Sequence, residues 1–415
     1  MMLSKWSWKL LQLSRKLWVR TSLFTLLALI TAGLALLLEN VIPAALAGAI
    51  GSSAVEKILT ILATSMLTVT TFSLSIMVVA FNAASTGVSP RATRLLMDDS
   101  TTQNALATFI GSFLFSVVSI VLLSTDLYGN SGRVVLFVIT IGVIALIVIT
   151  ILIWIEHLSG LGRVGETAKR VETEAYDAIK HCGQHPWLDA NPLVSLEDIP
   201  SEARPVCTGK IGYIDHIDVN ALQQWAAKHD ASVYLSNLPG AFIHKKRPLM
   251  WIAGSDVSTR QPLLDAVSIS DYRSFDQDPR FGLRVLAEIA SKALSPGIND
   301  PGTAIEIIGR GVRVLSNWQC DNDHNEVKYP NVWAPQVQLS ELFDNFFRSI
   351  ARDGAANIEV QIRLQKACLA LADYGPQFKL CAKEQAAAAL ARAELVMIYQ
   401  PDIALLKRLN KQLDD

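Results

Sequence analysis

The sequence predicts an α-helical membrane domain with four transmembrane helices, followed by a cytoplasmic α+β domain that ends in a helical bundle. Three observations predict this fold class. Apolar residues make up 51% of the 415-residue chain, and their excess lies before residue 158. The apolar runs in that part have the length of a membrane span. The sequence beyond it has the composition of an ordinary globular domain.

Four apolar runs of about 20 residues are expected to cross the membrane. Trp18 and Trp154 lie at the ends of runs, where tryptophan is favoured at the membrane interface. The first run is long for a signal peptide, so we expect an uncleaved anchor rather than cleavage after Ala45-Leu46-Ala47. The predicted spans cover about 19–38, 58–82, 105–124 and 134–155.

The positions of the basic residues predict the orientation of these spans. Lysine and arginine are frequent before the first run, Arg91 and Arg94 follow the second, and Arg163 follows the fourth. The other two loops carry only Lys57 and Arg133. Because cytoplasmic loops are enriched in basic residues, we predict that both termini are cytoplasmic.

The predicted spans lack the groups that ion-coupled transporters need. They contain no Asp, Glu, Lys, Arg or His other than Arg20 at an edge, and no internal proline. Proton-coupled carriers use ionisable groups inside the membrane, and many use broken helices. The sequence therefore argues against an ion-coupled transporter.

The remaining chain divides into segments with different patterns. "KIGYIDHID" and "ASVYLS" alternate like strands around the helical "NALQQWAAKH", and apolar residues recur at helical spacing in "FGLRVLAEIASKAL" and "TAIEIIGRGVRVLSNW". We therefore predict a membrane domain at 1–157, a helix and linker at 158–207, a small α+β or sandwich-barrel-like module at 208–256, and a mainly helical cytoplasmic domain at 257–415.

Composition and motifs exclude several functions. A net charge of −1 gives no basic surface for nucleic acid, and five scattered cysteines form neither a disulfide framework nor a zinc pattern. We find no nucleophile elbow, phosphate-binding loop, zinc-protease motif or dinucleotide fingerprint. No catalytic residue, cofactor or metal is therefore predicted.

The second apolar run carries a polar stripe. The spacings of 4, 4, 3, 4, 7 and 4 residues place its members on one face of a helix, within about 80°. Such hydroxyls can pack helices together, or they can line a hydrated, uncharged pore. A pore would require several copies of this four-span chain. The stripe consists of Thr60, Thr64, Thr68, Thr71, Ser75, Asn82 and Thr86.

The pore interpretation also assigns neighbouring residues. Arg91 and Arg94 would lie at the inner mouth, where they would favour anions if they face the lumen. Met77 or Val79 would form an apolar gate.

A second candidate region lies at residues 271–306. "DYRSFDQDPRFGLR" is dense in Asp and Arg, which is typical of an ion-paired surface turn but also suits a divalent ion or another ligand. In "SPGINDPGTA", Pro and Gly end one helix, while Asp300 is placed to cap the next. The candidate ligand or subunit-contact residues are Asp271, Arg273, Asp276, Asp278, Arg284, Asn299 and Asp300.

Several blocks of the chain resemble an uncharacterised family of bacterial predicted inner-membrane proteins, classed as a domain of unknown function. These blocks are "FSLSIMVVAFNAASTGVSPR", "GYIDHIDVNAL", "PGAFI" and "RSFDQDPRFGLRVLAEIASKALSPGINDPGTA". The chain departs from the family pattern at Gly302, where a large residue usually follows Asp-Pro. The resemblance implies a four-span region in the inner membrane with a cytoplasmic domain, and it implies no activity.

Together, these patterns favour a homo-oligomeric membrane pore, an ion channel assembled or gated by the cytoplasmic domain. Its expected partners are the lipid bilayer, further copies of the chain, and a small ion or anionic ligand, but not nucleic acid. A membrane-anchored enzyme or ligand sensor using residues 271–306 is the main alternative. A membrane-anchored scaffold is the second.

Overall fold

The chain forms two compact units in the computed structural model. The membrane unit contains the described residues up to Thr86 and those from Thr93 to Glu166. The soluble unit contains Gly87–Ala92 and the residues from Thr167 onward. The Ala45-Leu46-Ala47 motif, where the sequence predicts no cleavage, lies outside the described residues. The structure describes residues 17–37, 52–97, 99–125, 130–254, 260–319 and 327–414.

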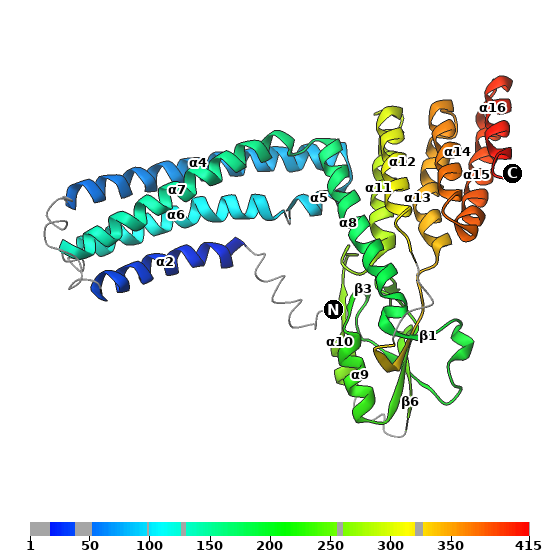
Figure 1. Cartoon of the computed structure of the whole chain (residues 1–415), viewed down its shortest axis with the longest axis horizontal. Coiled ribbons are helices and arrows are strands. Elements are labelled where there is room, and N and C mark those ends of the chain that lie inside the picture. The colour runs from blue at the N-terminus through cyan, green and yellow to red at the C-terminus, as the bar shows by residue number, and fades with distance from the viewer. Residues whose placement is uncertain are drawn as a thin grey trace. The chain divides into compact units, whose positions relative to one another are not determined.

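The membrane unit is made of helices (Figure 1). Among the described residues, α4, α6 and α7 are long and apolar enough to cross a membrane. The first predicted span coincides with α2, whose apolar stretch is shorter, so a fourth span stays a prediction. The helices are α2 (Leu17–Leu37), α4 (Ser52–Gly87), α6 (Ser100–Ser124) and α7 (Asn130–Gly160). Helix α5 (Pro90–Met97) begins in the soluble unit and ends in the membrane unit.

Helix α6 forms the centre of the membrane unit. Its Phe109 and Phe115 side chains are fully buried in a cluster shared with α4 and α7. Helix α2 packs on α6 and α7. At the contact with α6, the Phe24 ring occupies the space that a side chain at Gly111 would need, so glycine permits the close approach of these two helices.

Polar contacts join three helices of this unit. Asp99 caps α6 by accepting a 2.8 Å hydrogen bond from the Thr102 amide. His157 Nε2, near the end of α7, lies 2.9 Å from Asp99 Oδ2. One turn earlier, Trp154 Nε1 donates a 3.0 Å hydrogen bond to Ser73 Oγ of α4. These contacts set how α4, α6 and α7 are arranged within the unit.

Two sheets form the α+β part of the soluble unit. The larger has the strand order β1-β8-β4-β6-β2 and mixes parallel with antiparallel pairs, and the smaller has the order β5-β3-β7. The strands are β1 (Ala190–Pro192), β2 (Arg204–Cys207), β3 (Gly212–Ile217), β4 (Ala231–Leu235), β5 (Phe242–Ile243), β6 (Pro248–Gly254), β7 (Val267–Ser270) and β8 (Tyr329–Ala334).

The larger sheet draws strands from three of the predicted segments. Strands β1 and β2 come from 158–207, where the sequence suggests a linker, and β8 comes from the mainly helical 257–415 segment. The edge strands β1 and β2 are short and contain proline, so they show little of the alternation that identifies a strand. The module at 208–256 is therefore completed by strands from both of its neighbours.

Helices α9 (Val219–Lys228) and α10 (Gln261–Ala266) pack against these sheets. Val219, Leu222 and Ala226 of α9 are buried in a core shared with strands of both sheets. Asp218 caps α9 by accepting a 3.0 Å hydrogen bond from the Ala221 amide. Helix α8 (Val164–Gln184) precedes the sheets in the chain. Short 3-10 turns lie at Pro186–Asp189 and Leu196–Asp198.

A helical region completes the soluble unit. Phe343, Phe346 and Phe347 of α13 are buried at its centre, and the Phe346 ring lies against Gly311 of α12, where a larger side chain would clash. The prediction of a C-terminal helical region is confirmed. Its helices are α11 (Pro279–Ala293), α12 (Pro301–Leu315), α13 (Leu339–Asp353), α14 (Ile358–Ala372), α15 (Pro376–Val396) and α16 (Gln400–Lys411).

The "SPGIND" stretch is a corner between α11 and α12. The Asp300 amide donates a 2.8 Å hydrogen bond to the Ala293 carbonyl, which closes the end of α11. The Asp300 carboxylate then accepts a 3.0 Å hydrogen bond from the Thr303 amide, and Pro301 begins α12. The corner expected from the sequence is thus confirmed in its details.

Candidate functional site

Helix α4 has one face that packs within the membrane unit. Val55, Leu59 and Met66 are buried in an apolar cluster with side chains of α6 and α7. Ser73 lies on the same face, where it accepts the hydrogen bond from Trp154. These residues recur at the spacing of one helix face, so they fix which side of α4 points into the unit.

The polar stripe of α4 lies on the other side. At about 100° per residue, its centre is about 190° from the centre of the packing face. Within the described part of the membrane unit, the stripe therefore points away from α6 and α7. Its seven members are all exposed: Thr60, Thr64, Thr68, Thr71, Ser75, Asn82 and Thr86.

The hydroxyl groups of the stripe donate to their own helix. Thr64 Oγ1 donates a 2.9 Å hydrogen bond to the Thr60 carbonyl, and the other hydroxyls of the stripe bond similarly to carbonyls three or four residues earlier. Each oxygen keeps acceptor capacity on the outward side. Among the described residues, the Asn82 side-chain amide has no hydrogen-bond partner. The outward face of α4 thus presents neutral acceptor oxygens and one free amide.

Apolar side chains border this stripe. Ile61, Phe72 and Val79 are 65–68% exposed and lie along one edge of it. Of the two residues considered for an apolar gate, Val79 lies beside the stripe, whereas the half-buried Met77 lies toward the packing face. The helix positions therefore favour Val79.

Helix α6 carries a second stripe that sequence reasoning missed. Thr108, Ser112, Ser116 and Ser119 recur at spacings of 4, 4 and 3 residues, and all four are buried inside the membrane unit. Ser116 Oγ donates a 2.8 Å hydrogen bond to the Ser112 carbonyl. The same periodicity that identifies the α4 stripe would have identified this one.

The segment that follows α4 belongs to the soluble unit and is held there by Glu288 of α11. Glu288 accepts hydrogen bonds from Ser89 Oγ at 3.1 Å and from Arg91 Nη1 at 2.9 Å. Arg91, a predicted inner-mouth residue, is therefore paired with a carboxylate while 58% of its side chain stays exposed. The side chain of Arg94 lies outside the part of the chain that the structure describes. Glu288 is a contact that the sequence did not reveal.

The Asp/Arg cluster at 271–306 contains a buried ion-pair network. The Asp278 carboxylate is 2% exposed and lies 2.6 Å from Arg273 Nη2 and 3.2 Å from Arg280 Nε. Arg280 also donates a 2.6 Å hydrogen bond to the Pro239 carbonyl. Burial lowers the pKa of Arg280, but the charges of Asp278 and Glu341 outweigh it and hold that pKa above its usual value. Both oxygens of Asp278 are thus occupied by arginine.

The other members of the predicted cluster lie in different surroundings. Asp271 and Asp276 are exposed. Arg284 lies 3.8 Å from Glu288, and Asn299 and Asp300 lie in the corner before α12. Among the described residues, no three His, Cys, Asp or Glu side chains are placed to hold a metal ion. A ligand or subunit-contact role for these residues stays a prediction.

Comparison with known proteins places this arrangement among uncharacterised membrane proteins. A family model described as "Predicted membrane protein (DUF2254)" matches residues 14–370. Uncharacterized proteins of Mycobacterium tuberculosis and Mycobacterium bovis are 26% identical over 263 residues, which is 60% of this chain and 50% of theirs. The chain thus spans about half the length of these curated relatives. No solved structure matches it.

Proposed function

The chain belongs to the DUF2254 family of predicted membrane proteins, and on that premise we propose that it forms a homo-oligomeric membrane pore lined by the polar face of α4. The pore is an ion channel assembled or gated by the soluble unit. The observation that carries the proposal is the outward direction of the α4 stripe. All seven of its residues are exposed, on the side of α4 opposite the face that packs with the described residues of α6 and α7.

The outward face of α7 supports this argument by contrast. Its exposed residues include Val138, Ile149, Leu152 and Ile153, all of them aliphatic and each more than half exposed. Aliphatic side chains suit contact with lipid, whereas an unpaired amide and rows of acceptor oxygens are costly there. We therefore assign α7 to the lipid and the α4 stripe to the interior of an assembly.

A ring of α4 helices accounts for the chemistry of the stripe. In the assembly, Thr64, Thr68 and Thr71 of each copy surround a hydrated path, and Asn82 lies toward its cytoplasmic end. Rings of neutral hydroxyls give weak charge selectivity, and Val79 narrows the path with apolar surface. Because Arg91 pairs with Glu288, its charge contributes less to anion selectivity than an unpaired arginine would.

Through the contact at Glu288, the soluble unit can act on the end of the proposed pore helix α4. Ser89 and Arg91 follow α4 directly in the chain, and both are held by α11 through Glu288. A displacement of α11 within the soluble unit would therefore pull on the segment that ends the pore helix. This is how we propose that the soluble unit gates the pore.

Planar-bilayer recording of the purified full chain tests the proposal. We expect a conductance that changes when Thr68→Val and Thr71→Val remove the hydroxyls from the lumen. Thr70→Val is the matched control, because Thr70 is a threonine of the same helix that lies off the stripe and bonds to the Met66 carbonyl. A conductance that responds equally to all three substitutions would contradict a lumen at the stripe.

Oligomeric state in detergent is a second readout. A pore requires several copies, so a protein that is monomeric in every detergent and in lipid nanodiscs would overturn the proposal. The absence of current at all voltages, tensions and pH values would instead favour the anchored enzyme, ligand sensor or scaffold alternatives.

A further inference from the structure

An open groove with several charged side chains along it lies between α8 and α12 in the soluble unit. Its volume of about 570 Å³ lies within the size range of small-molecule sites. The α8 side of the groove is formed by residues at positions i, i+3, i+4 and i+7, so they share one face of the helix. These residues are Lys169, Glu172, Thr173 and Tyr176.

The α12 side of the groove has the same spacing. Arg310, Arg313, Val314 and Asn317 again occupy positions i, i+3, i+4 and i+7. Helix faces that meet in a soluble domain are ordinarily apolar. Here two facing surfaces are charged and polar, and packing of a core does not explain that choice of residues.

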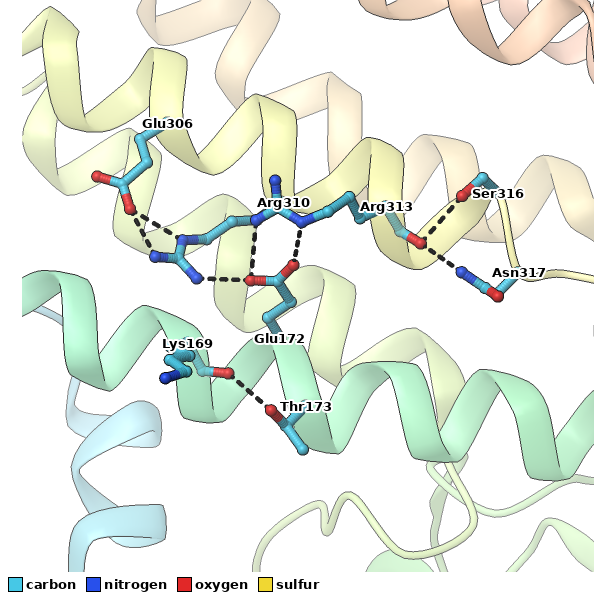
Figure 2. A network of polar contacts seen from close by, with 8 residues as sticks. All are labelled: Lys169, Glu172, Thr173, Glu306, Arg310, Arg313, Ser316 and Asn317. Atoms are coloured by element: carbon cyan, nitrogen blue, oxygen red, sulfur yellow. Dashed lines mark hydrogen bonds and ion pairs between the residues drawn. The ribbon is translucent and has the colours of Figure 1, made fainter.

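One carboxylate bridges the two helices. Figure 2 shows Glu172 reaching from α8 toward Arg310 and Arg313, and it accepts hydrogen bonds from both guanidinium groups. Burial raises the pKa of Glu172, but hydrogen bonds and charges from Arg313 and Arg310 outweigh it and hold that pKa below its usual value. Glu172 is therefore ionised at neutral pH.

The groove nevertheless has an excess of positive charge. Lys169, Arg310 and Arg313 line it with three positive charges against the single negative charge of Glu172. Arg310 also forms an ion pair with Glu306, whose side chain is half-exposed and does not line the groove. Among the described residues, Arg313 Nη1, the Lys169 ammonium and the Tyr176 hydroxyl have no hydrogen-bond partner. The groove therefore offers an anion both free hydrogen-bond donors and positive charge.

We propose that the groove between α8 and α12 binds the phosphate group of a small organic ligand. Arginine forks and a lysine ammonium are the groups that proteins use to hold phosphate oxygens. The groove is larger than a phosphate ion needs, so the ligand carries an organic part, which the half-buried Tyr176 contacts. The proposal does not depend on the pore, because the groove lies entirely within the soluble unit.

The same phosphate chemistry occurs in soluble phosphate esters and in lipid headgroups. The experiment therefore titrates the detergent-solubilised full chain with glycerol 3-phosphate and, separately, with dihexanoyl phosphatidic acid, and measures binding by calorimetry. Both probes carry a phosphate monoester on glycerol, and only the second carries acyl chains. Tighter binding of the first assigns a soluble ligand, and tighter binding of the second assigns a lipid.

Variants of the groove give the decisive comparison. Arg313→Gln leaves Glu172 paired with Arg310, and Lys169→Gln breaks no ion pair among the described residues, so both are expected to fold. Each should weaken binding of the preferred probe about tenfold, because one charge-assisted contact is lost. The matched control is Arg352→Gln, an exposed arginine of α13 that pairs with Asp353 and should bind like the unsubstituted chain.

The proposal is overturned if neither probe binds. It is also overturned if the two groove variants bind as tightly as the unsubstituted chain, or if Arg352→Gln weakens binding as much as they do. Circular dichroism of each variant shows that a change in binding is not a loss of fold.

Discussion

Helices α4 and α6 carry hydroxyl side chains at the same helical spacing, but the two stripes face opposite environments. Thr108, Ser112, Ser116 and Ser119 of α6 are buried among the helices of their own subunit. The α4 stripe is exposed along its length, and the buried face of α4 lies on the other side of that helix. Equal patterns in the sequence therefore lie in two different environments in the structure.

The contrast shows when a hydroxyl stripe indicates a pore. Small hydroxyl residues allow helices to approach closely, and that role is complete once the stripe is buried, as it is on α6. The α4 stripe is not buried against the described helices of the membrane unit, so packing within that unit does not explain it. In the assembly that we propose, water and further copies of the chain contact it.

The largest expected contrast between the stripes is in chemical accessibility. We expect Thr68→Cys to react with a water-soluble thiol reagent in reconstituted protein, because a hydrated lumen exposes it, whereas Ser116→Cys should not react. Cys368 is the internal reference for a buried thiol. Burial raises its pKa to about 12, so near neutral pH its reactive thiolate is roughly three orders of magnitude scarcer than that of an ordinary cysteine.

The measurement is the labelling rate followed by mass spectrometry, in a background that keeps Cys368 as the only native cysteine. Labelling of Cys368 should begin only as the pH approaches about 12 or the protein unfolds. Equal, slow labelling of the cysteines introduced at 68 and 116 would mean that lipid or protein covers both stripes.

A second contrast concerns stability. Ser116→Leu forces a larger side chain into the packed interior of the membrane unit and should lower the free energy of unfolding by about 1–3 kcal/mol. Thr68→Leu changes an exposed position and should alter the stability of the subunit by less than about 0.5 kcal/mol. Thermal unfolding followed by size-exclusion chromatography compares the two. If Thr68→Leu proved as destabilising as Ser116→Leu, the α4 stripe would be packing surface as well.

The smallest expected effect concerns the contact that follows α4. Glu288→Gln weakens the bonds from Ser89 and Arg91, and because Arg91 is exposed we expect a stability loss below about 1 kcal/mol. In bilayer recordings, however, the variant should shift the fraction of time that the pore is open. Glu359→Gln, at an exposed glutamate of α14, is the control and should leave opening unchanged. If both variants are open for the same fraction of time, the contact between Glu288 of α11 and the segment after α4 does not control the opening of the pore.

The structure also changes how the alternative site can be tested. Asp278→Ala is the direct test of an enzyme site in this cluster, because it would abolish catalysis there and leave a pore intact. Asp278 is buried between Arg273 and Arg280, so its removal leaves buried guanidinium charge without its partner. Such a change costs about 3–5 kcal/mol and would destabilise the soluble unit whatever its function. Asp271 and Asp276, which are exposed, are cleaner positions for that test.

Local patterns predicted much of this chain because their causes are local. The corner at Asp300 follows from Pro, Gly and a capping carboxylate within a few residues, and three of the apolar runs form helices long enough to span a membrane. Strand β8 could not be predicted in the same way. Its place between β1 and β4 depends on pairing with strands about 100 residues or more earlier in the chain.

Hydropathy and helical periodicity are properties of neighbouring residues, so they were enough to predict the division into membrane and soluble parts and the polar face of α4. The resemblance to the family rests on the quoted sequence blocks instead. Only the tertiary structure decided that the polar face of α4 points outward while the α6 stripe is buried. It also decided that Glu288 holds the segment after α4, and that Glu172 meets two arginines across a groove. Each of these depends on which distant helices pack together, and burial and charge pairing are settled by that packing.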